Sequence, residues 1–338
     1  MTNVSTFCHK IAVAFTVMLS LLVAAPSSAD DSDPLPSWQA GSAKTAITDF
    51  VSAVTTKGPR YVAPADRIAV FDNDGTLWPE NPVPFQAAFA FDEIRHRAET
   101  DSELAADPMV KALLGGDLPT LMAGKHHDGL MHILALTHAG MTTETFEASV
   151  NAWLARAKHP KFGRRYDQLT YQPMQELLRY LRANDFKPFI VSGGGADFMR
   201  VWSERVYGIP PEQVVGSTAQ AKFEMQNGKP VLVKTLDHLF VDDKEGKPVG
   251  IQQFIGRRPI MVIGNSDGDK AMLEYGTIGN PRPSLGVIIH HTDAPREYQY
   301  NVNPKSSGTL VEALKDAPAR GWTVVDMAKD WKTVFAEP

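Results

Sequence analysis

The chain has 338 residues and a formal net charge of −5, and 43% of its residues are hydrophobic and 22% are charged. These values are typical of a globular protein with room for one large domain or two, and they exclude a mainly disordered chain. An acidic chain without a basic run is a poor candidate for binding DNA or RNA, so we expect no nucleic-acid partner. The only cysteine, Cys8, lies near the N-terminus and excludes a disulfide framework.

The first 29 residues have the pattern of an export signal. Lys10 is their only charged residue, residues 11–25 are apolar, and residues 27–29 form a small-residue cleavage site before Asp30. A membrane-anchored helix is the alternative, but an apolar core of about fifteen residues is short for a bilayer, which needs about twenty. We therefore predict a signal peptide over residues 1–29, no stable membrane anchor after its cleavage, and a periplasmic or secreted protein.

The next segment, residues 30–40, is polar and rich in proline and serine, and we predict that it is a flexible leader. Beyond it, apolar side chains recur at helical spacing and predict the first helix of the folded part. These side chains are Ile47, Phe50, Val51 and Val54.

Two carboxylates follow the first predicted strand. Residues 68–71 form a continuous apolar run, which is typical of a parallel strand that is covered on both faces. Asp72 and Asp74 come next, and in extended geometry their side chains start on the same face before Gly75 lets the chain turn. Thr76 adds a hydroxyl. Acids that serve only as turn formers are the alternative interpretation.

The segment between residues 80 and 165 shows helical patterns and no convincing strand. The clearest patterns cover residues 85–97, 118–138 and 142–158. We therefore expect a helical region between the first predicted strand and the rest of the sheet.

From residue 166 onward, predicted helices and strands alternate. Strands at residues 189–191, 213–217 and 285–290 with helices between them indicate parallel βαβ units. Two further strands, at residues 222–226 and 230–235, flank Asn-Gly, which is the strongest two-residue hairpin signal.

Three later segments place polar residues at the end of a predicted strand or at the start of a predicted helix. The strand at residues 189–191 ends in Ser192 and a run of three glycines. Lys247 precedes a proline that favours the first turn of a helix. The apolar run at residues 259–263 ends in the loop of residues 265–269, which contains Asn, Ser, Asp and Gly.

Together with Asp72 and Asp74, these segments resemble the four ordered motifs of the haloacid dehalogenase-like superfamily of phosphohydrolases, and in particular its phosphoserine-phosphatase-like members. The resemblance covers roughly residues 65–292, and four ordered motifs are more specific than any one of them. It implies an α/β fold, in which a Rossmann-like parallel sheet forms the core and a helical cap is inserted. We assign the core to residues 41–79 and 166–338, and the cap to residues 80–165.

The resemblance also implies roles for the motif residues. Asp72 would be the nucleophile that forms an aspartyl-phosphate, and Asp74 the general acid and then the general base. Ser192 and the amide of Gly193 would donate hydrogen bonds to the phosphoryl oxygens, and Lys247 would neutralise negative charge. Other lysines near the third motif are alternatives to Lys247. They are Lys222, Lys234 and Lys244.

Thr76 and Glu80 are further candidates for substrate binding. Thr76 contributes its hydroxyl, and Glu80 lies where related phosphatases often use an acid to hold a substrate amine. An ordinary exposed residue is the alternative for Glu80.

The resemblance implies Mg²⁺, because clustered carboxylates would otherwise repel a phosphate and because oxygen ligands suit this ion. Asp72 and the backbone carbonyl of Asp74 would be ligands. The fourth motif departs from the family pattern, since Asn265 stands where an acid is usual. An amide oxygen can bind a metal but brings no charge, so Asp267 or Asp269 would supply the missing carboxylate. A turn that caps the following helix is the alternative for this loop, and the two roles are compatible.

We therefore predict an exported, Mg²⁺-dependent phosphatase that hydrolyses a small phosphomonoester. A protein that binds a phosphorylated ligand without turnover is one alternative, and the Asn265 departure motivates it. A phosphotransferase or mutase of the same superfamily is another. Asp74 argues against dehalogenation, which needs no acid for a leaving group.

Overall fold

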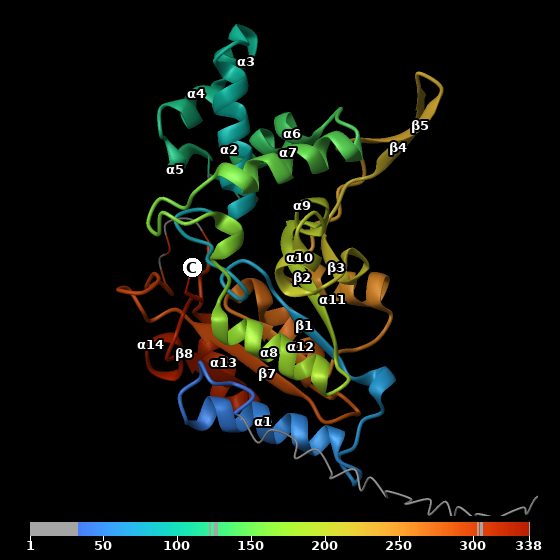
Figure 1. Cartoon of the computed structure of the whole chain (residues 1–338), viewed down its shortest axis with the longest axis vertical. Helices are drawn as coiled ribbons and strands as arrows, with labels where there is room; N and C mark the ends of the chain where they lie inside the picture. Colours follow the sequence, from blue (N-terminus) through green and yellow to red (C-terminus); the bar gives the residue numbers. More distant parts are fainter. Residues whose placement is uncertain (1–32, 122, 125–127, 303, 305–306, 338) are drawn as a thin grey trace, which may run out of the picture. The chain divides into compact units, whose positions relative to one another are not determined.

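The computed structural model describes residues 33–121, 123–124, 128–302, 304 and 307–337 (Figure 1). The predicted signal peptide, residues 1–29, lies outside these ranges. Within the described ranges, every helix is too short or too polar to cross a bilayer.

A six-stranded sheet forms the centre of the fold, and all its paired strands are parallel. The strand order is β3-β2-β1-β6-β7-β8. The strands are β1 (Ile68–Phe71), β2 (Lys187–Gly195), β3 (Val214–Ser217), β6 (Met261–Gly264), β7 (Leu285–His290) and β8 (Thr323–Asp326). This sheet confirms the predicted α/β class with a Rossmann-like core.

Strand β1 lies between β2 and β6 and is buried on both faces. Ala69 and Phe71 belong to one hydrophobic cluster, whereas Ile68 and Val70 belong to a second. The chain extends the sheet from β1 to β2 and β3 on one side, and then returns to place β6 on the other side of β1. A reversal of this kind leaves a crevice at the carboxyl ends of the two strands, where open α/β sheets bind ligands.

Helices cover the sheet and connect its strands. Apart from the helices α2 to α7 described below, those that precede β3 are α1 (Ser42–Thr55), η1 (Pro64–Asp66), η2 (Tyr166–Gln168), α8 (Gln172–Ala183), α9 (Ala196–Arg200), α10 (Ser203–Tyr207) and η3 (Pro211–Gln213). Those that follow it are α11 (Gly246–Gly250), the π-helix η4 (Ile251–Ile255), η5 (Asp267–Asp269), α12 (Lys270–Thr277), α13 (Glu312–Arg320) and α14 (Met327–Asp330).

Between β1 and η2 the described elements are helical, and Figure 1 shows them gathered in one group. They are α2 (Phe85–Ala98), α3 (Ser102–Ala106), α4 (Pro108–Leu114), α5 (Leu118–Leu121), α6 (Asp128–His138) and α7 (Thr143–Arg156). Aromatic side chains join them, because the Phe89 ring lies 5.9 Å from Phe146 and 5.7 Å from Trp153. The boundaries of a cap domain at residues 80 and 165 stay a prediction.

A separate two-stranded antiparallel hairpin consists of β4 (Ala221–Gln226) and β5 (Lys229–Lys234). Asn227 and Gly228 both have positive φ, 51° and 76°, as the two central residues of a type I′ turn require. The hairpin reaches the helical group, since Thr142 and Val233 form an antiparallel bridge.

The predicted flexible leader, residues 30–40, differs from the structure over its described part. Leu35 and Trp38 are fully buried. The Trp38 indole donates a hydrogen bond to the carbonyl of Pro173 at 3.0 Å, and its ring meets Trp331 edge-on at 6.0 Å. Two large apolar side chains are enough to anchor a segment whose average composition is polar.

We expect Trp38→Ala to lower the free energy of unfolding by about 3–5 kcal/mol, because it empties a buried indole site. Gln39→Ala, at an exposed neighbour, should change it by less than about 0.5 kcal/mol. Urea unfolding of both variants measures the difference. Equal stabilities would show that this segment contributes nothing to the fold.

Candidate active site

Three of the predicted site residues, Asp72, Asp269 and Lys247, meet at the carboxyl ends of β1 and β6. Lys247 Nζ lies 2.6 Å from Asp72 Oδ1 and 2.6 Å from Asp269 Oδ1, and it donates to the carbonyl of Val191 at 3.0 Å. Burial lowers the pKa of Lys247, but the charges of Asp269 and Asp72 and the hydrogen bonds to them outweigh burial and raise the pKa above its usual value. The amine is therefore positively charged. This single ammonium group joins the first, second and fourth motifs.

The first motif places two acids side by side in different surroundings. Burial and the charges of Asp269 and Asp74 raise the pKa of Asp72 well above its usual value, although Lys247 opposes them. Burial also raises the pKa of Asp74, to about 6. Since only Asp72 contacts the ammonium group directly, the two acids are poised differently, as a nucleophile and a proton donor must be.

Trp78 orients Asp74, and the sequence analysis did not assign it this role. The indole Nε1 donates to Asp74 Oδ1 at 2.7 Å, which opposes the rise in pKa. Trp78 is fully buried against the rings of Phe85 and Trp202, at 4.3 and 4.1 Å. The indole is therefore held in place by packing, and the only signal in the sequence was an aromatic residue one turn beyond the acid.

The glycine run after β2 lies beside Asp74. A methyl group placed on Gly194 would lie 3.4 Å from Ser192 Oγ and 3.5 Å from Asp74 Oδ2, so the hydroxyl and the carboxylate flank the same small space. Ser192 Oγ accepts a hydrogen bond from the Gly194 amide at 3.2 Å, which leaves its proton available for another acceptor. Gly193 is exposed and faces Asp243.

Gln86 on α2 connects the helical group to this glycine run. Its Oε1 accepts a hydrogen bond from the Gly195 amide at 2.7 Å, and its Nε2 lies 3.1 Å from Nε2 of His138 on α6. The amide can only donate there, so His138 accepts and is neutral. Gln86 is a second residue that the sequence analysis missed, because nothing in the local pattern distinguishes it from a surface glutamine.

Thr76, Glu80 and Asn265 form a buried polar cluster next to the first motif. The Thr76 hydroxyl donates to Asn265 Oδ1 at 3.1 Å, and Asn265 Nδ2 donates to Glu80 Oε1 at 2.6 Å. Tyr300 also donates to Glu80 Oε1, at 2.8 Å. Glu80 is only 3% exposed, so the alternative of an ordinary surface residue is wrong. Burial raises its pKa to about 7.

The two acids of the fourth motif already have partners. Asp269 contacts Lys247 through Oδ1, and its Oδ2 accepts from the amides of Asn265 and Ser266 at 2.9 and 3.0 Å. Asp267 faces α13 instead, where its Oδ1 accepts from the Ala313 amide at 2.8 Å. The structure therefore does not bring Asp267 into the site, since it caps a helix that lies far along the chain.

The donor set nevertheless suits a hard divalent cation. Asp72 offers a carboxylate, Asp74 a backbone carbonyl and Asn265 an amide oxygen, and oxygen ligands of these kinds bind Mg²⁺. Burial raises the pKa values of Asp72, Asp74 and Glu80, although the charges of Lys247 and His291 oppose the rise. In the described part of the chain, no three His, Cys, Asp or Glu side chains are grouped to hold a metal, so the carbonyl and the amide would be needed.

His291 holds the turn of the first motif. Its Nε2 lies 2.7 Å from the carbonyl of Gly75, and its Nδ1 lies 3.0 Å from Glu297 Oε2. Both neighbours accept hydrogen bonds, so both ring nitrogens carry protons and the ring is cationic. Burial lowers the pKa of His291, but the Glu297 and Glu80 carboxylates and the Gly75 carbonyl together raise it above its usual value. His291 follows the end of β7, and its partners could not be identified from the sequence.

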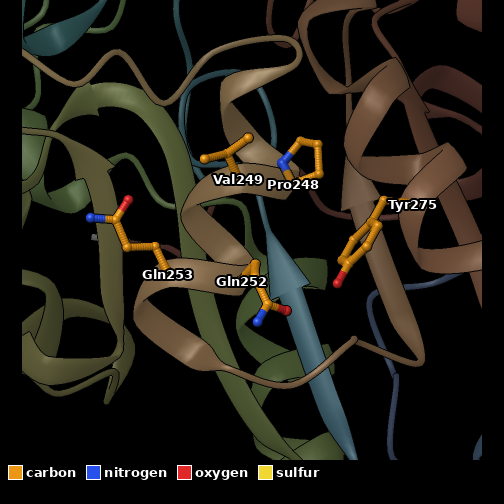
Figure 2. A pocket seen from close by; sticks show the side chains of 5 residues that line it. All are labelled: Pro248, Val249, Gln252, Gln253 and Tyr275. Atoms are coloured by element: carbon orange, nitrogen blue, oxygen red, sulfur yellow. The ribbon is translucent and has the colours of Figure 1, made fainter.

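The centre is enclosed, because Asp72, Ser192 and Lys247 are 7%, 1% and 2% exposed. A surface hollow of about 470 Å³ lies beside α11 and η4, and Figure 2 shows the side chains that line it. Uncharged side chains line it, namely Pro248, Val249, Gln252, Gln253 and Tyr275. Lys247 does not line this hollow, and its amine contacts Asp72 and Asp269 instead, so the hollow is not part of the candidate site.

Comparison with known proteins agrees with this arrangement of motifs. The family model described as haloacid dehalogenase-like hydrolase matches residues 69–274, which is more than half of the chain. The chain therefore belongs to the haloacid dehalogenase-like hydrolase family. No curated protein matches it.

Solved structures resemble the fold at low sequence identity. A conserved protein of unknown function from Anaerococcus prevotii DSM 20548 is 15% identical, with a TM-score of 0.54 over 87% of this chain and 96% of that chain. A protein of unknown function from Bordetella pertussis Tohama I is 17% identical, with a TM-score of 0.46 over 77% and 98%. A phosphoserine phosphohydrolase-like protein from Francisella tularensis subsp. tularensis SCHU S4 is 18% identical, with a TM-score of 0.38 over 66% and 87%.

Asp267→Ala tests whether this acid caps a helix or binds a metal. We expect the free energy of unfolding to fall by about 1 kcal/mol, as for other lost helix caps, while the Mg²⁺ concentration for half-maximal activity stays unchanged. Asp267→Asn should retain most of the stability, because Asn caps well. A large increase in the Mg²⁺ requirement for both variants would instead make Asp267 a ligand.

His138 should make stability depend on pH. Burial, and then the charge of Lys234, lower its pKa in the folded protein to about 4 from 6.5. The unfolded chain therefore binds a proton that the folded protein refuses, and stability should fall by roughly 3 kcal/mol as the pH falls from 6.5 to 4. Urea unfolding across this range should show a shallower loss for His138→Gln. Parallel curves for the two proteins would contradict the assignment.

Proposed function

We propose that the protein is an exported, Mg²⁺-dependent phosphatase that hydrolyses a small phosphomonoester through an aspartyl-phosphate on Asp72. The contact between Lys247 and Asp72 carries this proposal, because it fixes one carboxylate oxygen 2.6 Å from a buried ammonium. A nucleophile held in this way has one oxygen anchored and the other free to react.

In the first step, the second oxygen of Asp72 attacks phosphorus and forms an O–P bond. The bond from phosphorus to the leaving oxygen breaks, and Asp74 transfers its proton to that oxygen. The raised pKa of Asp74, about 6, suits a group that must be protonated at this stage. The Trp78 indole holds the carboxyl group in position for the transfer.

In the second step, the Asp74 carboxylate accepts a proton from water, and the water oxygen attacks the phosphorus of the aspartyl-phosphate. The bond between Asp72 and phosphorus breaks and inorganic phosphate leaves, so both acids return to their starting states. Ser192 and the Gly193 amide donate hydrogen bonds to the phosphoryl oxygens, and Lys247 offsets the charge that develops on Asp72.

The carboxylate of Asp72, the carbonyl of Asp74 and the amide oxygen of Asn265 would hold Mg²⁺. The bound ion would screen the carboxylates from an anionic substrate and polarise the phosphoryl group. The donor chemistry and the surplus of buried negative charge support this assignment.

The enclosed centre favours a small substrate. Asp72 is 7% exposed, so a substrate would need the site to open, and a movement of the helical group that does this would break the hydrogen bond from Gly195 to Gln86. The side chains of this group would then meet the leaving alcohol, which makes it a cap that selects substrates. A screen of small phosphate esters, including phosphoserine and phosphocholine, with and without chelator, identifies the preferred alcohol.

Export is proposed from the sequence of residues 1–29. Cleavage after Ala29 would leave a mature chain that begins at Asp30. Cell fractionation and N-terminal sequencing test this directly, and a full-length chain in the cytoplasm would contradict it.

We expect Asp72→Asn to lower kcat on a generic aryl phosphate by roughly three orders of magnitude or more, since it removes the nucleophile. Asp49→Asn, an exposed acid on α1, is the matched control and should retain wild-type activity. Chelator should abolish activity and added Mg²⁺ should restore it. Full activity in Asp72→Asn would refute the mechanism.

The same assay separates the alternatives. A protein that only binds a phosphorylated ligand would release at most one phosphate per molecule, whereas a phosphatase releases many. A mutase or phosphotransferase would leave the phosphoryl group on an organic product, which phosphorus NMR distinguishes from inorganic phosphate.

A further inference from the structure

Asn265, which stands where the family pattern has an acid, forms a hydrogen-bonded pair with the buried carboxylate of Glu80. The Glu80 carboxylate lies directly against the Asn265 amide, with 2.6 Å between Nδ2 and Oε1. The two residues are 185 positions apart in the chain. The carboxylate that position 265 lacks is therefore supplied nearby by Glu80, which is hydrogen-bonded to Asn265.

The pair determines how the Asn265 amide is oriented. A carboxylate only accepts hydrogen bonds, so the amide nitrogen must face Glu80 and the amide oxygen must face away from it. On that other side, Asn265 Oδ1 meets the hydroxyl of Thr76, which belongs to the first motif. The oxygen that can bind a cation is thus directed toward the loop that carries Asp72 and Asp74.

The surroundings of Glu80 are shaped to hold a carboxylate. Gly75 and Gly308 have positive φ, 80° and 88°. A methyl group on Gly75 would collide with both Asn265 Nδ2 and Glu80 Oε1, and one on Gly308 would collide with Glu80 Oε1. Two glycines therefore leave the space that the carboxylate occupies.

The direct partners of Glu80 are neutral. Asn265 donates an amide hydrogen and Tyr300 donates its hydroxyl hydrogen at 2.8 Å. In the described part of the chain, Glu80 forms no ion pair with a lysine or arginine. A buried carboxylate with neutral donors is stabilised by positive charge nearby. The His291 cation acts on Glu80 without a hydrogen bond to it, and a cation at the Asn265 oxygen would add a second favourable charge.

We propose that Glu80 supplies the negative charge that position 265 lacks, acting on the metal through the amide of Asn265. Asn265 is then the ligand, and Glu80 is a positioning residue that orients and polarises it. Carboxylates that stand behind metal ligands commonly contribute to affinity in this way. This inference rests on the proposed function, because it requires a divalent cation at Asp72. It assigns to Glu80 a role other than holding a substrate amine.

The test measures metal affinity directly, by calorimetry with Mg²⁺ and by electron paramagnetic resonance with Mn²⁺, on the purified full chain. Glu80→Gln keeps the size of the side chain and removes its charge, and we expect the dissociation constant to rise 10- to 100-fold. Glu176→Gln is the matched control. Glu176 is another buried glutamate, held by Ser37 and Gln172, and its replacement should leave metal affinity unchanged.

The decisive variant combines Glu80→Gln with Asn265→Asp. It exchanges the acid and the amide across the same hydrogen bond, so total charge and shape are conserved while the carboxylate moves to the ligand position. We expect metal affinity to return to within about threefold of wild type. Thermal unfolding without metal verifies that each variant is folded.

Each contrary outcome has a distinct meaning. Unchanged metal affinity in Glu80→Gln would overturn this inference and leave the phosphatase proposal intact. A weakened Glu80→Gln that the double variant does not restore would also overturn it. A higher KM for amine-bearing esters alone, at unchanged metal affinity, would return Glu80 to substrate binding. Absence of metal binding by the wild type would overturn this inference together with the Mg²⁺ dependence.

Discussion

The structure of the site depends on one buried ammonium group. The Lys247 amine is 2% exposed, and it is balanced by Asp72 and Asp269 at 2.6 Å and by the carbonyl of Val191 at 3.0 Å. A buried charge is stable only when its partners are close and well oriented. Asp72 directly follows β1, Val191 lies in β2 next to Ser192, and Asp269 lies in the loop after β6, so the stability of the amine depends on the same three strands that form the site.

The strands, the hairpin and the position of Lys247 could be predicted from the sequence, because local patterns determine them. The apolar runs of β1 and β6 are buried throughout, and each is followed by polar residues at the carboxyl end. The turn at Asn227 and Gly228 sets the hairpin. Lys247 lies at the start of a short helix, as its following proline indicated, and its amine reaches the first motif.

The rest depends on contacts between residues far apart in the chain. Asp267 and Asp269 lie two positions apart in the same loop, but Asp267 faces α13 and Asp269 faces Lys247. The packing of α13 against the loop makes this difference, and the local sequence does not show it. Gln86 meets Gly195 across 109 positions and His291 meets Gly75 across 216. The anchoring of Trp38 depends likewise on a carbonyl 135 residues away. No window of local sequence contains such pairs.

The charges around the first motif follow a simple order. Lys247 contacts Asp72 and Asp269, while the His291 cation contacts Glu297 and the Gly75 carbonyl. Asp74 and Glu80 are hydrogen-bonded by neutral groups instead. Burial raises their pKa values to about 6 and about 7, although the charge of Lys247 opposes the rise for Asp74 and that of His291 opposes it for Glu80. In the proposed function, Asp74 exchanges a proton and Glu80 supports a cation, and both roles require a carboxyl group that is not paired directly with a lysine or arginine of the protein.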